Sequence, residues 1–181
     1  MQLKRVPGHV LMRYFAWVIL AFAVCTAGCA GRVRKEKFEN VYRAAKAVEG
    51  ALGVGVNLPK FTELVQTFST EVSIAADTAS NSTEKTMVGL YREALAAYQD
   101  SLTVWQKKIG GHQESLGIAN DPELRRIVET YPIGGRGRGE SFTFEPDDAI
   151  RNIWTYARGK ADAANSLFNG ESVSDVPAVP R

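Results

Sequence analysis

The sequence predicts an all-α protein, an antiparallel bundle of four long heptad-patterned helices with one short helix in a long connection. Four segments repeat apolar residues at alternating steps of three and four, which places these residues along one side of a helix. The possible strands, LGVGV and ESFTF, are short and bounded by glycine or loop residues. Short links between the first three segments favour antiparallel neighbours, and 181 residues, 45% of them hydrophobic, suffice for one core.

The first two predicted helices follow one another closely. Gly53 and Gly55 interrupt the first helix, Asn57 can cap the free N–H groups of the second, and Pro59 suits its first turn. The apolar seam of the first helix is Phe38, Val41, Ala45, Val48 and Leu52, and that of the second is Phe61, Val65, Phe68, Val72, Ala75 and Ala79.

The third predicted helix is the longest. Asn81 is its candidate cap, and Glu84 is placed to reach back to the N–H of the cap residue. Gly110 and Gly111 mark its end. Its seam is rich in aromatic residues and consists of Val88, Tyr91, Leu95, Tyr98, Leu102, Trp105 and Ile109.

A short helix and a fourth long helix complete the pattern. Asp121 and Pro122 open the short helix, whose apolar face is Leu124, Ile127, Val128 and Tyr131. Pro146 opens the last long helix and Gly170 ends it. The seam of that helix is Ile150, Trp154, Ala157, Ala161, Ala164 and Phe168. The stretch IGGRGRGES between the two helices predicts a flexible loop.

Residues 1–28 predict a secretory signal segment. A basic stretch comes first, the apolar run YFAWVILAFAV of 11 residues follows, and small residues come last, which is the layout of a signal peptide. The two cysteines, Cys25 and Cys29, lie at the end of this region and leave the folded body without any. Their C-x-x-x-C spacing disfavours a redox pair.

The residues TAGC resemble the lipid-attachment box of bacterial lipoproteins. Ala27 and Gly28 match the small residues of that box, and Cys29 matches the modified cysteine. The resemblance implies that Cys29 carries lipid and becomes the first mature residue, and the following Ala30 and Gly31 imply the outer membrane, facing the periplasm. Two alternatives stay open: a single-span membrane anchor, because the tolerable apolar run reaches 17 residues, or ordinary cleavage behind Ala27 or Ala30.

A basic cluster follows the cysteine and consists of Arg32, Arg34, Lys35 and Lys37. If Cys29 is lipidated, these cations lie within about one Debye length of the membrane surface, where each adds roughly 1 kcal/mol of attraction to anionic lipid. The sequence therefore predicts a membrane-surface contact. The alternative is a helix start in which Glu36 and Glu39 pair with the basic residues locally.

The stretch GGRGRG is the one segment with a ligand-like composition. Its glycines allow close backbone approach, and Arg136 with Arg138 can pair with a small anion or a lipid head group. The Lys and Ser/Thr of a P-loop are missing, which disfavours a nucleotide site. The alternative is a solvated connector.

The sequence offers no catalytic, metal-binding or cofactor-binding pattern. After processing, one histidine and one methionine remain, His112 and Met87, and neither belongs to a haem or zinc motif. A solvated loop position explains His112. Asp147 and Asp148 fit the start of a helix, where the dipole favours carboxylates.

These observations together predict a lipid-anchored envelope protein, acting as a structural or interaction module without catalysis. An unknown envelope protein is its candidate partner. The alternative is an envelope protein that binds a small anion or lipid through the 134–144 loop. Removing three basic residues with the signal segment leaves 22 − 3 = 19 basic against 20 acidic residues, which gives no reason to expect nucleic acid. The predicted organisation is a signal segment (1–28), a basic membrane-proximal segment (29–37), a helical domain (38–170) and a disordered tail (171–181).

Overall fold

The computed structural model describes residues 31–112 and 114–171. The chain divides into two units, Met1–Gly31 and Arg32–Arg181, and the second is described below. The predicted signal segment, the lipidation of Cys29 and most of the predicted tail fall outside the described residues. Within those residues, no helix combines the length and the apolar character that crossing a membrane requires.

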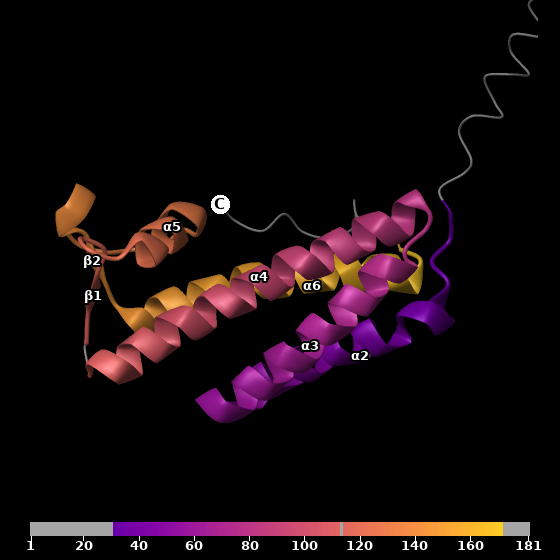
Figure 1. Ribbon diagram of the computed structural model, residues 1–181, viewed down its shortest axis with the longest axis horizontal. Coiled ribbons are helices and arrows are strands. Elements are labelled where there is room, and N and C mark those ends of the chain that lie inside the picture. Colours follow the sequence, from indigo (N-terminus) through magenta and orange to yellow (C-terminus); the bar gives the residue numbers. More distant parts are fainter. Residues whose placement is uncertain (1–30, 113, 172–181) are drawn as a thin grey trace, which may run out of the picture. The chain divides into compact units, whose positions relative to one another are not determined.

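The described chain is mainly helical, which confirms the predicted all-α class (Figure 1). Two short strands and one 3-10 turn lie in the connection that contains the short helix, with one strand before that helix and the turn and the second strand after it. The elements are α2 (Lys35–Val54), α3 (Leu58–Thr78), α4 (Ser82–Gly111), β1 (Leu116–Gly117), α5 (Pro122–Thr130), η1 (Gly139–Ser141), β2 (Thr143–Phe144) and α6 (Pro146–Asn169).

Three of the helices, α3, α4 and α5, begin at a residue whose side chain caps the first turn. The Asn57 side chain accepts a hydrogen bond from the N–H of Lys60 (3.0 Å) at the start of α3. At the start of α4, Asn81 accepts from the N–H of Glu84 (2.9 Å), and Glu84 reaches back to complete a capping box. Asp121 caps α5. These bonds satisfy N–H groups that a helix leaves free in its first turn, and they confirm the predicted starts.

The helices α4 and α6 pack along their lengths and run in opposite directions. Tyr91 of α4 donates to Asn165 near the end of α6, whereas Lys108 near the end of α4 pairs with Asp147 at the start of α6. Alanines on the contacting helices are fully buried, and these short side chains allow a close approach of the two axes. They are Ala94, Ala97, Ala149, Ala157, Ala161 and Ala164.

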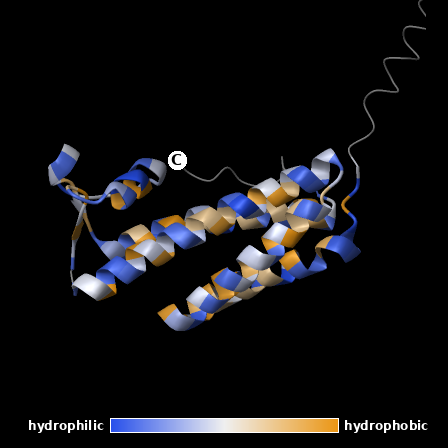
Figure 2. Cartoon of the chain, in the orientation of Figure 1, coloured by the Kyte–Doolittle hydropathy of each residue, from blue (hydrophilic) through white to orange (hydrophobic). Residues whose placement is uncertain are grey.

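The core contains aromatic rings in edge-to-face contact. Phe68 of α3 meets Tyr91 and Tyr98 of α4, and Phe61 meets Tyr98 and Trp154, with ring centroids 5.4 to 6.3 Å apart. Each long helix accordingly carries apolar residues on part of its circumference and polar residues on the rest (Figure 2). Apart from Ile109, the predicted seams form this core or pack against it, because their spacing places them on one side of each helix.

The helix α5 is fastened to α4 and α6 by a buried carboxylate and an aromatic pair. Arg126 donates to both oxygens of Asp100 (3.1 and 2.5 Å), and the Tyr131 hydroxyl donates to Asp100 Oδ2 (2.8 Å). The Tyr131 ring packs edge-on against Tyr156 of α6. The connection is therefore held against the helix pair.

The stretch LGVGV forms the last turn of α2 and the link to α3. Two features differ from the sequence prediction. Ile109, the last residue of the predicted α4 seam, is 49% exposed, because the helix continues beyond the aromatic contact between Trp105 and Phe61. The folded unit also begins before residue 38, since Val33 is buried and α2 starts at Lys35.

Candidate functional site

The glycine-rich stretch forms a closed hairpin. The N–H of Arg136 donates to the carbonyl of Thr143 (2.7 Å), and the N–H of Thr143 donates back to the carbonyl of Arg136 (2.8 Å). A side chain on Gly135 would meet the Thr143 carbonyl oxygen at 2.3 Å, and Gly137 has a φ of +86°. Glycine is therefore required on both sides of Arg136. The predicted flexible loop is instead a turn that fixes the backbone of Arg136.

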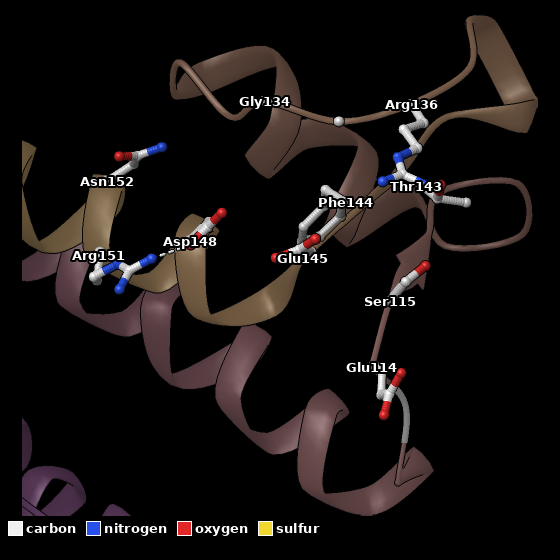
Figure 3. Close-up of a pocket in the computed structure, with 11 residues that line it drawn as sticks. Glu114, Ser115, Gly134, Arg136, Thr143, Phe144, Glu145, Asp148, Arg151 and Asn152 are labelled. Carbon is white, nitrogen blue, oxygen red and sulfur yellow. Dashed lines mark hydrogen bonds and ion pairs between the residues drawn. The ribbon is translucent and has the colours of Figure 1, made fainter.

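A cavity of about 620 Å³ opens beside this hairpin (Figure 3). Its walls come from the segment after α4, from the hairpin and from the first two turns of α6. The residues that line it are Glu114, Ser115, Gly134, Gly135, Arg136, Thr143, Phe144, Glu145, Asp148, Arg151 and Asn152. Its volume lies in the range of small-molecule sites, although it is open to solvent and largely polar.

The cavity carries charges of both signs. Arg151 pairs with Asp148 within it (Figure 3). Among the described residues, Arg136 has no acidic group within ion-pair distance, and neither Glu114 nor Glu145 has a basic one. Three carboxylates thus face two guanidinium groups, and three of these five charges lack an ionic partner from the described protein.

The structure separates the two arginines of the predicted anion site. Arg136 lines the cavity, whereas Arg138 does not. The backbone of Arg138 is instead closed onto Ser141, whose Oγ donates to the Arg138 carbonyl (2.9 Å). Anion binding by this pair stays a prediction, and the carboxylates that share the cavity with Arg136 were not foreseen. They come from the segment after α4 and from the start of α6, and the fold brings both segments to the hairpin.

A second charged feature lies where the chain enters the folded unit. We call it the N-terminal clasp and define it as Arg34, Ser80 and Glu84. Arg34 donates from Nε to Glu84 Oε1 and from Nη2 to Oε2, each at 2.8 Å, and its own N–H also donates to Oε1 (3.3 Å). Ser80 donates to Oε2 from its N–H (3.0 Å) and its hydroxyl (3.2 Å).

The Glu84 carboxylate is fully buried by this arrangement, with a side-chain exposure of 0%. The Arg34 guanidinium and the surrounding N–H donors hold the pKa of Glu84 well below its usual range, although burial acts in the opposite direction. A charge can be buried in this way because its lone pairs are satisfied and a cation faces it. The sequence predicted the capping role of Glu84 but not its burial or its partner.

The clasp also bears on the predicted membrane-contact residues. Arg34 is engaged by Glu84, and the Lys35 ammonium lies 5.4 Å from the centre of the Phe168 ring. Arg32 and Lys37 are exposed. Contact of these four residues with a membrane stays a prediction, and the structure adds a folding role for Arg34.

A helix end and two ion pairs account for the remaining titratable residues that the sequence singled out. His112 is exposed and ends α4 with a φ of +47°. Asp147 pairs with Lys108, and Asp148 with Arg151. In the described part of the chain, no group of three or more histidine, cysteine or acidic residues is placed to hold a metal ion.

The chain was compared with protein families, curated proteins and solved structures. No family model matches the chain, and no curated protein or solved structure shows significant similarity to it.

Proposed function

We propose that this chain is a lipid-anchored protein of the bacterial cell envelope, tethered through Cys29 and acting as a structural or interaction module without catalysis. In this proposal its four long helices, α2, α3, α4 and α6, form an antiparallel bundle. The opposite directions of α4 and α6 support that arrangement.

The N-terminal clasp is the observation that carries the proposal. The folded unit comes close in sequence to the lipobox-like residues, since Val33 is buried at 7% exposure and Arg34 is fixed on Glu84. Val33 lies four positions after Cys29, which corresponds to at most about 14 Å when the chain is fully extended. A lipid on Cys29 would therefore hold the clasp end of the bundle next to the membrane.

Exposed basic residues at this end favour the same orientation. Arg32, Lys35 and Lys37 all lie within the first turn of α2 or just before it, and each is exposed. Near an anionic surface, each would contribute about 1 kcal/mol of attraction. Stable anchoring commonly combines a lipid with such a basic patch.

The opposite end of α4 would then extend away from the membrane. A helix of 30 residues is about 45 Å long. The far end carries α5, the Arg136 hairpin and the cavity, and a protein partner in the envelope would meet these elements. The proposed location is the outer membrane, facing the periplasm, with a single-span anchor as the alternative.

Metabolic labelling with a fatty-acid analogue tests the tether. We expect the wild-type chain to incorporate the label and Cys29→Ser to lose it. Cys25→Ser is the matched control, since it changes the neighbouring cysteine and should keep the label. Equal labelling of wild type and Cys29→Ser, or no label in either, would refute lipidation at Cys29.

A further inference from the structure

We propose that the cavity beside the Arg136 hairpin binds a small zwitterion, a molecule that carries a carboxylate or phosphate at one end and an ammonium group at the other. The proposal rests on the charges and geometry of the cavity. It does not depend on the tether, and it replaces a simple anion as the expected ligand of this region.

Arg136 supplies the anion-binding half. Its backbone is fixed by the two hydrogen bonds to Thr143 and by the glycines on both sides, so the side chain starts from a defined point on the cavity wall (Figure 3). A guanidinium group presents paired N–H donors that match a carboxylate or phosphate. Because no described acidic group pairs with Arg136, these donors are available to a ligand.

Glu114 and Glu145 supply the ammonium-binding half. Both line the same cavity, and neither forms an ion pair with a described residue. Asp148 contributes less, since Arg151 already neutralises it. The ammonium group of a ligand would donate hydrogen bonds to the two free carboxylates.

The balance of charges selects the ligand class. A simple anion drawn to Arg136 would approach two unpaired carboxylates in the same cavity, and a simple cation drawn to those carboxylates would approach Arg136. In the first case the two carboxylates repel the anion, and in the second the guanidinium group of Arg136 repels the cation. A zwitterion places opposite charges against both walls, so each ionic group of the cavity gains a partner. The neutral surface around these groups, including Ser115, Thr143 and Asn152, offers further polar contacts.

Ligand-observed NMR titration of the full chain tests the proposal. The zwitterionic probes are glycine, β-alanine, 4-aminobutyrate and 6-aminohexanoate, which separate the two charges by increasing lengths. Acetate, inorganic phosphate and methylammonium are the single-charge probes. All are compared at one ionic strength. We expect saturable binding of at least one amino acid and at least about tenfold weaker binding of every single-charge probe.

Substitutions of the cavity residues test whether the amino acid binds in this cavity. Arg136→Ala and the double variant Glu114→Gln/Glu145→Gln should each weaken binding of the amino acid by about tenfold or more, the loss of one charge-assisted hydrogen bond. Arg138→Ala is the matched control, since it removes the same charge from the same hairpin outside the cavity, and binding should stay within about twofold. Unchanged circular dichroism and melting temperature would show that the variants fold.

Three outcomes would overturn the proposal. The first is saturable binding of none of the amino acids. The second is binding of acetate or phosphate that equals amino-acid binding and is indifferent to Glu114→Gln/Glu145→Gln, which would indicate an anion site. The third is an equal loss in Arg138→Ala and Arg136→Ala, which would indicate non-specific attraction to the hairpin.

Discussion

The two ends of α4 use arginine and glutamate in opposite ways. At the first turn, Arg34 meets the buried carboxylate of Glu84, which accepts hydrogen bonds from Arg34, Ser80 and the N–H of Asn81. Beyond the last turn, Arg136 and Glu145 line an open cavity without ionic partners among the described residues. The same residue types thus stabilise the fold at one end and remain available to a ligand at the other.

Burial explains the difference. A buried carboxylate is costly unless its lone pairs are satisfied, so Glu84 tolerates little change. Exposed charges keep their water, so Arg136 and Glu145 can lack partners at little cost to stability. Substitutions at the clasp should therefore affect folding, whereas substitutions in the cavity should affect binding.

The largest expected effect is that of Glu84→Ala. This change removes the capping box and the buried hydrogen bonds of the clasp, and the free energy of unfolding should fall by about 3 kcal/mol. Urea unfolding measures this loss. Lys85→Ala, at the next and exposed position, should change stability by less than about 0.5 kcal/mol. Similar values for the two variants would contradict a structural role for the clasp.

The clasp also predicts a pH dependence. The pKa of Glu84 is lowered in the folded protein, whereas in the unfolded chain it is about 4.3. The stabilisation is therefore fully present above that value and is lost as the pH falls from it towards the folded pKa. Between about pH 6 and about pH 3, wild type should lose more stability than Glu84→Gln. Parallel losses would show that Glu84 is not linked to folding in this way.

At the other end of α4, the hydrogen bonds of the Arg136 hairpin should depend on glycine at position 135. Gly135→Ala forces a Cβ against the Thr143 carbonyl, so the protection of the Arg136 and Thr143 amides against hydrogen exchange should fall by about 2 kcal/mol. Gly134→Ala is the control, because nothing lies within 4 Å of the added Cβ. If both variants retain protection, the hairpin does not depend on close approach at Gly135.

Two tyrosines on α4, one heptad apart, give the smallest effects and opposite signs. The Tyr91 hydroxyl donates to Asn165 Oδ1 (2.8 Å), whereas the buried Tyr98 hydroxyl has no hydrogen-bond partner among the described residues. Tyr91→Phe should lower the free energy of unfolding by about 1 kcal/mol, and Tyr98→Phe should raise it by about 1 kcal/mol. Urea unfolding compares the two variants. Equal losses would mean that Tyr98 does gain from its hydroxyl.

The sequence predicted what depends on local chemistry. The starts of α3, α4 and α5 were identified from Asn57, Asn81 and Asp121, because a cap and the N–H groups it satisfies lie within a few residues of each other. The buried seams were identified from their spacing, since the helical period fixes which residues share a face.

The sequence could not predict what depends on distant segments. Arg34 and Glu84 are 50 positions apart, and no periodicity links them. The burial of Asp100 likewise requires Arg126 and Tyr131 from α5. The glycines around Arg136 suit a flexible loop and a tight hairpin equally well, and only the pairing with Thr143 decides between these states.

If Cys29 is lipidated as proposed, the short tether and the clasp should keep the first turn of α4 next to the membrane. Fluorophores attached through Ser82→Cys and Gln106→Cys, about 36 Å apart on that helix, can be compared by energy transfer to acceptors in the head groups of vesicles that carry the lipidated protein. We expect clearly stronger transfer from position 82 than from position 106. Equal transfer from both positions, or stronger transfer from position 106, would contradict the proposed orientation of α4.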